Sequence, residues 1–126
     1  MELTITINNE NQYLDVVTSG DINKDNSLNM VEQIAFASIK NKIKKILIDH
    51  SRIDSVLGEI LDVYGRPEEF KGKGVLCGIK VAEVIKPEHK EFFHFLETTC
   101  RNRGYQFKMF VDHKSALEWL LGSDSY

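Results

Sequence analysis

Short apolar runs alternate with amphipathic helical patterns from residue 13 onward, and this alternation limits the possible folds more than any other feature. Residues 13–19, 46–48 and 75–79 have the composition of strands, and helical patterns separate them. Strands joined by helices pair in parallel through right-handed crossovers. The sequence therefore predicts an α/β fold whose sheet is mostly parallel and carries helices on its faces.

The first strand is the expected exception to the parallel arrangement. In residues 2–7, Leu3, Ile5 and Ile7 alternate with polar residues, which predicts a strand with one buried face. A short polar connection leads to the next strand, and this length favours an antiparallel hairpin. With a last strand at residues 105–111, the predicted order is ββαβαβαβα, a mixed sheet of about five strands.

Four helices complete this order. Asp25, Asn26 and Ser27 are competing N-caps for a first helix that runs to about Lys42. Its predicted buried side consists of Leu28, Val31, Ile34, Ala35 and Ile39. Phe36 falls among the polar residues of the opposite side.

The other three helices follow from caps and breakers. Asp54 is the expected cap of a second helix that ends near Gly65. Pro87 fits the first turn of a third helix, which continues to Arg103 before Gly104. Its expected inner stripe is Phe92, Phe95, Leu96 and Thr99. The last helix is capped by Asp112 and carries Ala116, Leu117, Trp119 and Leu120, with Trp119 expected to anchor it in the core.

Composition indicates a single globular domain. The 126 residues are 42% hydrophobic and 28% charged, with a net charge of −3, and no linker-like shift in composition divides them. Acidic and basic residues are interspersed, which disfavours nucleic acids and anionic membranes as partners. No secretory leader or membrane-spanning run is recognisable. We expect one domain over residues 1–126, in the cytoplasm and without integral membrane contact.

Nucleotide and metal motifs do not fit the sequence. The glycine-lysine segment 72–74 lacks the earlier glycine and the following hydroxyl residue of a P-loop, and it leads into a strand. His89 and His94 are five residues apart on one helix and point in different directions. Cys77 and Cys100 lie in apolar stretches without metal-ligand spacing. We therefore expect no cofactor and no metal.

Asp49, His50 and Ser51 follow the central strand, at the sheet edge where ligands of parallel sheets tend to bind. Neighbouring residues of an extended segment point in opposite directions, so His50 is poorly placed to activate Ser51 with Asp49 behind it. A strand end or a partner surface fits these residues better than a catalytic triad. Phe36 on its polar helix side and Phe93 at the flank of the third helix are further candidates for a contact patch.

Three segments are distinctive: the hairpin ending VVTSGDI, the strand KKILIDHS, and the ending YQFKMFVDHKSALEWL. They resemble the STAS domains, in particular the SpoIIAA-like branch of small free-standing bacterial proteins. The similarity covers nearly the whole chain and rests mostly on core positions, so it concerns the fold more than the activity.

The resemblance implies a non-enzymatic regulatory or protein-interaction module similar to anti-sigma-factor antagonists. In such proteins a serine at the start of the helix after the central strand is phosphorylated, which corresponds here to Ser55 beside Asp54, with Ser51 as a second candidate. The implied partner is a protein or a second copy in a homodimer. Because the branch also resembles the lipid-binding CRAL-TRIO fold, a small apolar, lipid-like ligand is the alternative, and a hydrolase centred on His50 is third.

Overall fold

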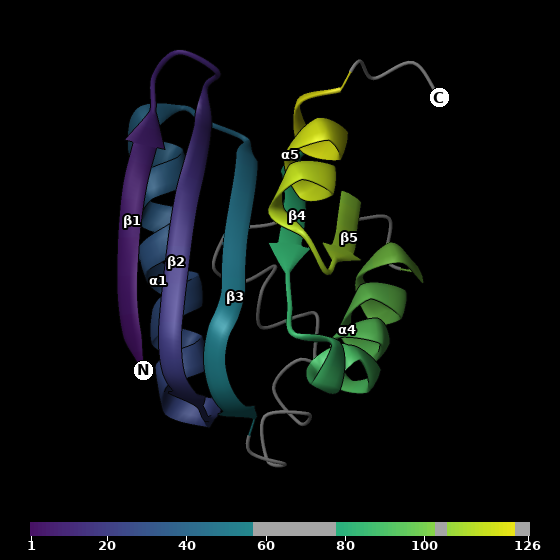
Figure 1. Ribbon diagram of the computed structural model, residues 1–126. Coiled ribbons are helices and arrows are strands. Elements are labelled where there is room, and N and C mark those ends of the chain that lie inside the picture. Colours follow the sequence, from purple (N-terminus) through teal and green to yellow (C-terminus); the bar gives the residue numbers. More distant parts are fainter. Residues whose placement is uncertain (57–77, 103–105, 123–126) are drawn as a thin grey trace.

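The computed structural model describes residues 1–56, 78–102 and 106–122, which form a five-stranded sheet with helices on both faces (Figure 1). The strands are β1 (Glu2–Asn8), β2 (Tyr13–Ile22), β3 (Lys45–Val56), β4 (Lys80–Val84) and β5 (Gln106–Phe110). The helices are α1 (Lys24–Asn41), α4 (Lys90–Asn102) and α5 (His113–Leu121), and a 3₁₀ turn (Pro87–His89) precedes α4. The predicted α/β class and the mixed sheet of five strands are confirmed.

The strands follow one another across the sheet in sequence order, β1-β2-β3-β4-β5. β1 runs antiparallel to β2, and the other three neighbouring pairs are parallel, as the sequence predicts. The connection between β1 and β2 is too short for a crossover, whereas α1 carries the chain back so that β3 can pair in parallel with β2. This order leaves β1 and β5 at the two edges of the sheet.

The sheet separates two hydrophobic cores. The larger core lies between the sheet and the helices α1 and α4, and the smaller core lies between the sheet and α5. Ile46 belongs to the larger core and its neighbour Leu47 to the smaller one, because successive strand residues point to opposite faces. The continuous apolar run of β3 therefore has a partner on each side, as expected for a central strand.

Helix α1 begins earlier than predicted and buries a different set of residues. Its N-cap is Asn23, whose side chain accepts a hydrogen bond from the backbone N–H of Asn26 at 3.0 Å, while the Asn26 side chain accepts from the Asn23 backbone at 2.9 Å. The prediction that Ile39 is buried is wrong, since its side chain is 64% exposed. Met30 is buried in the core, so the buried side of the helix lies closer to that residue than predicted.

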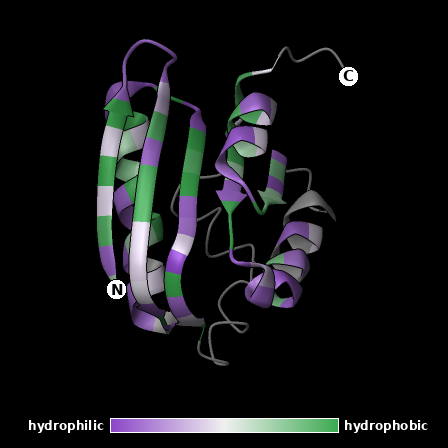
Figure 2. Cartoon of the chain, in the orientation of Figure 1, coloured by the Kyte–Doolittle hydropathy of each residue, from purple (hydrophilic) through white to green (hydrophobic). Residues whose placement is uncertain are grey.

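Strand β3 continues to Val56, so the prediction that it stops at Asp49 is wrong. Figure 2 shows the reason: a hydrophobic run lies near the start of the strand, and the residues that follow it are mostly hydrophilic. The second half still pairs with β2, up to Val56 beside Ile22, with irregularities in the register near Ser19 and Asp21. Asp54 therefore lies in a strand and does not cap a helix.

Strand β4 spans Lys80–Val84, displaced from the predicted residues 75–79. This strand contains two charged residues, Lys80 and Glu83, which are only 4% and 3% exposed. Each has an internal partner that makes its burial tolerable. The Lys80 ammonium donates a hydrogen bond to the carbonyl of Trp119 at 2.8 Å and lies 4.6 Å from the centre of the indole ring.

The C-terminal half agrees with the predicted order. The 3₁₀ turn begins at Pro87, and Asp112 caps α5 by accepting a hydrogen bond from the Ser115 backbone at 2.7 Å. Ala116 and Leu120 are fully buried, whereas Trp119 is half-buried and reaches the core only at its margin. In the parts of the chain that the structure describes, no helix has the length and hydrophobicity to cross a membrane.

Some predictions fall outside the described residues. The predicted second helix beyond Val56, the glycine-lysine segment 72–74, Cys77 and Gly104 belong to this group. So do the side chains of Leu28, Phe95, Leu96, Thr99 and Cys100.

The capping pair of α1 supplies a test of this helix boundary. We expect Asn23→Ala to lower the free energy of unfolding by about 1 kcal/mol, because the first turn loses a side-chain acceptor. Urea unfolding measures the change. Asn29→Ala, on the exposed side of the same helix, serves as the control and should leave stability unchanged or slightly higher. Equal effects of the two substitutions would contradict the Asn23 cap.

Candidate functional site

The structure distributes the sequence-predicted site residues over several places. His50 and Phe93 lie inside the larger core, and Asp49 lies on the other face of the sheet. Ser51, Asp54 and Ser55 lie along the second half of β3. Phe36 lies on the exposed side of α1.

His50 joins three neighbouring strands through buried polar contacts. Its Nδ1 atom lies 2.6 Å from the Thr18 hydroxyl on β2, and its Nε2 atom lies 3.1 Å from a carboxylate oxygen of Glu83 on β4. All three side chains are at least nine-tenths buried. The Thr18 hydroxyl also donates a hydrogen bond to the backbone carbonyl of Asp49 at 3.2 Å. Which atom donates in the Thr18–His50 contact depends on the tautomer of the ring.

Phe93 covers this polar group from α4. Its ring stacks on the His50 imidazole, with centroids 5.2 Å apart and planes inclined by 24°. Phe92 meets Phe93 edge-on at 4.8 Å. The prediction that Phe93 belongs to a contact patch is therefore wrong: the residue is 2% exposed and lies away from the surface where Phe36 is exposed. Helical periodicity placed Phe93 at the flank of the buried stripe because a single sequence does not show how α4 lies on the sheet.

The geometry assigns His50 a structural role. Its side chain is 1% exposed, and both ring nitrogens are engaged by side chains of neighbouring strands. A general base needs a nitrogen within hydrogen-bond reach of the proton that it removes from a substrate. In this arrangement neither nitrogen is open to a molecule from solution, and the structure supplies no support for a hydrolase centred on His50.

Asp49 and Ser51 do not join His50. The Asp49 carboxylate accepts a hydrogen bond from the Ser51 backbone N–H at 2.8 Å. On the face that carries α5, partial burial raises the pKa of Asp15; the electrostatic interaction with His113 opposes this shift, and that with Asp49 adds to it. The predicted divergence of Asp49 and His50 along an extended segment thus agrees with the structure.

Asp54 and Ser55 lie near the end of β3, where a helix start was expected. The Ser55 hydroxyl donates a hydrogen bond to the Asp21 carboxylate on β2 at 2.7 Å. Asp54 is exposed, and its carboxylate is 4.0 Å from the Lys86 ammonium. The predicted helix start was wrong because a hydrophilic strand end that contains Asp54 and Ser55 has the same composition as a capping sequence.

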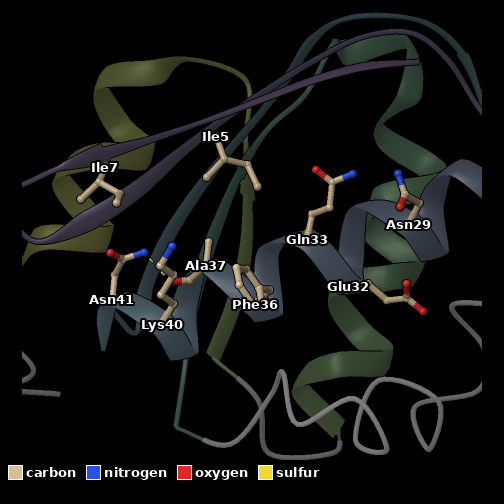
Figure 3. Close-up of a pocket in the computed structure, with 9 residues that line it drawn as sticks. All are labelled: Ile5, Ile7, Asn29, Glu32, Gln33, Phe36, Ala37, Lys40 and Asn41. Atoms are coloured by element: carbon tan, nitrogen blue, oxygen red, sulfur yellow. Dashed lines mark hydrogen bonds between the residues drawn. The ribbon is translucent and has the colours of Figure 1, made fainter.

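Phe36 borders a groove that the sequence did not reveal. Its side chain is 67% exposed, as the helical wheel predicted, and it lies beside a solvent-open groove of about 430 Å³ between α1 and the edge strand β1. Figure 3 shows Ile5 and Ile7 of β1 projecting toward the α1 side chains. The groove is lined by Ile5, Ile7, Asn29, Glu32, Gln33, Phe36, Ala37, Lys40 and Asn41. Only tertiary structure brings these two segments together.

Comparison with solved structures shows that this chain has a SpoIIAA-like fold. The unphosphorylated form of the anti-sigma factor antagonist SpoIIAA matches with a TM-score of 0.58 at 12% identity, over 97% of this chain and 100% of that chain. An anti-sigma factor antagonist from Mycobacterium paratuberculosis gives 0.59 at 15% identity, over 94% of each chain. An uncharacterized DUF3478-family protein from Shewanella loihica PV-4, described as SpoIIAA-like in fold, gives 0.54 at 21% identity, over 94% and 92%.

No protein-family model and no curated protein matches the sequence. At these low identities the structural similarity establishes the fold alone. It confirms the predicted SpoIIAA-like architecture, and a fold of this kind does not by itself define a function.

The buried pair of His50 and Glu83 can be tested by a double-mutant cycle. We expect His50→Phe and Glu83→Leu each to lower the free energy of unfolding by about 3–5 kcal/mol, because each leaves a buried polar partner behind. The double variant removes both polar groups and should be more stable than the sum of the two losses predicts. Urea unfolding of the four proteins measures the coupling, and strictly additive losses would contradict a direct contact.

Proposed function

We propose that this protein is a cytoplasmic regulatory module that acts by binding another protein and catalyses no reaction. The observation that carries the proposal is the exposed aromatic ring of Phe36 beside the groove between α1 and β1. Aromatic residues are enriched among the side chains that dominate binding energy in protein interfaces. The Lys40 ammonium lies 5.7 Å from the centre of the ring, so the patch combines an apolar surface with a charge at its rim.

The character of the buried ionisable residues supports the same proposal. His50, Glu83 and Lys80 are engaged with side chains or backbone of the interior. The protein thus uses these reactive groups to hold its layers together. Two of the structural neighbours named above are anti-sigma factor antagonists, whose name describes action on another regulatory protein.

A small apolar ligand is the second candidate, because the groove lies between a helix and a strand and has the volume of a small-molecule site. However, such sites bury most of the ligand surface, whereas this groove is open and its walls carry charged and amide side chains. A protein surface can cover an open groove and also contact its polar rim. The geometry thus favours the protein partner.

Phosphorylation is the proposed regulation, with Ser55 as the first candidate acceptor and Ser51 as the second. Ser55 is half-buried and bonded to Asp21, with Asp54 adjacent in the strand. A phosphate brings about −1.5 to −2 charges to its site. At Ser55 this charge would face the Asp21 carboxylate and replace a hydrogen bond by repulsion, which would loosen the paired ends of β2 and β3.

The electrostatic part of this regulation has a direct test. Ser55→Glu should lower the free energy of unfolding more than Ser55→Ala, because both remove the bond to Asp21 and only the first adds a negative charge. The difference should shrink at about 1 M salt, where the Debye length is about 3 Å. Denaturant unfolding at low and high salt measures it. Equal stability of the two variants at low salt would remove the repulsion from the proposal.

Phe36→Asp tests the binding surface. The variant should fold normally, because the side chain is exposed, and should bind the partner at least about tenfold more weakly, because a carboxylate would have to be desolvated at the contact. Proteins captured from a lysate of the source cells identify the partner, and calorimetry with the purified partner measures the affinity.

Val111→Asp is the matched control, since Val111 is 56% exposed and follows β5, at the opposite edge of the sheet from β1. A partner that binds the Phe36→Asp variant more weakly than it binds this control supports the proposal. A partner that binds all three proteins equally would exclude the Phe36 surface. Turnover of a substrate that vanishes in a folded His50→Ala variant would overturn the non-enzymatic function.

A further inference from the structure

Strand β1 presents an unprotected sheet edge. Among the described residues, no strand pairs with its outer side, and it runs for seven residues without a proline and with a charge only at its first residue, Glu2. Natural proteins usually blunt such edges with charged residues, proline or very short strands, because the outer backbone N–H and C=O groups can pair with another chain. The opposite edge follows this rule, since β5 is five residues long and carries Lys108.

The sequence of β1 is complementary to itself in the antiparallel direction. When two copies pair with Ile5 opposite Ile5, all seven residues of each strand find a partner. The pairs are Glu2 with Asn8, Leu3 with Ile7, Thr4 with Thr6, and Ile5 with Ile5. Apolar residues meet on one face, threonines meet on the other, and no like charges are opposed, which is the pairing that stabilises neighbouring strands.

The same two-fold arrangement brings the grooves of two copies together. Leu3, Ile5 and Ile7 point to the face that carries α1, so the paired strands place both helices on one face of a continuous sheet. Helix α1 packs on β2 and lies behind β1 and β2 in Figure 1. Three strand spacings of about 4.8 Å then separate the two helices by roughly 14 Å.

A separation of this size exceeds the 8–10 Å of direct helix packing, so long side chains have to fill the space. Phe36 lies beside Ile5 in the groove and is therefore near the two-fold axis (Figure 3). The twist of the sheet inclines the two helices and concentrates their contact there. Glu32 and Lys40 lie four residues before and after Phe36, so the antiparallel arrangement brings each glutamate toward the lysine of the other copy.

We propose that the partner bound at this surface includes a second copy of the chain, held by antiparallel pairing of the two β1 strands around Ile5 and by Phe36 from each α1. This inference rests on the proposed function, in that it names an occupant for the same groove. The arrangement covers Phe36 in both copies. Self-association and the binding of a different protein at Phe36 therefore exclude one another.

A charge exchange on β1 tests the register. Thr4 and Thr6 are exposed on the face away from the groove, so the double variants T4K/T6K and T4E/T6E should fold, which thermal unfolding checks. Sedimentation equilibrium over a range of concentrations should show a dimer for the wild-type chain. Each double variant alone should dissociate at least about tenfold more readily, since position 4 of one copy would oppose a like charge at position 6 of the other.

An equimolar mixture of the two double variants should recover the dimer, because opposite charges then meet at every exchanged pair. Phe36→Asp should also weaken the dimer, while Ile39→Asp should not, since Ile39 is similarly exposed and does not line the groove. A monomeric wild-type chain at all concentrations, or a mixture that fails to recover association, would overturn the inference.

The two proposals fail in different ways. If the wild-type chain is monomeric but a captured protein still depends on Phe36, only the self-association is wrong. If the charge exchange restores a dimer but no other protein distinguishes Phe36→Asp from Val111→Asp, only the binding of a different protein is wrong.

Discussion

The structure depends on two charged residues in a single short strand, β4. Lys80 and Glu83 of β4 are both buried, and their separation of three residues sends them to opposite faces of the sheet. Glu83 meets His50 beneath the layer formed by α1 and α4, and Lys80 binds the last turn of α5. A cation near the carboxyl end of a helix is also favoured by the helix dipole. One strand of five residues thus fixes the layers on both sides of the sheet.

The features that follow from local periodicity could be predicted from the sequence. The hairpin, the alternation of strands and helices and the exposed position of Phe36 all follow from patterns within a few turns of chain. The predictions failed where charged and polar residues lie within strands. β4 was placed too early because Lys80 and Glu83 look like surface residues, and β3 was ended too soon because its second half is hydrophilic. Only partners from distant segments make the burial of Lys80 and Glu83 favourable, and a single sequence does not identify those partners.

The candidate site shows the same limit of prediction from a single sequence. His50 attracted attention as a possible catalyst, yet its neighbours Thr18 and Glu83 come from two other strands and convert it into an internal link. Thr18 follows Leu14 and Val16 in a period-two pattern, which is the sequence signal that it faces the core. The groove beside Phe36 had no local signal, since it arises where an edge strand and a helix meet. The surface proposed for partner binding therefore depends on how distant segments pack together more than on a sequence motif.

The sequential strand order has a consequence for how the chain is made. Because each strand pairs with the strand that precedes it, every new strand finds its neighbour already synthesised. Contacts between elements close in sequence cost less chain entropy to form than distant ones. The sheet can therefore grow vectorially during translation, from β1 toward β5. Among the described strands, β1 is made first, and its outer edge stays unpaired while each later strand adds to the opposite edge of the sheet.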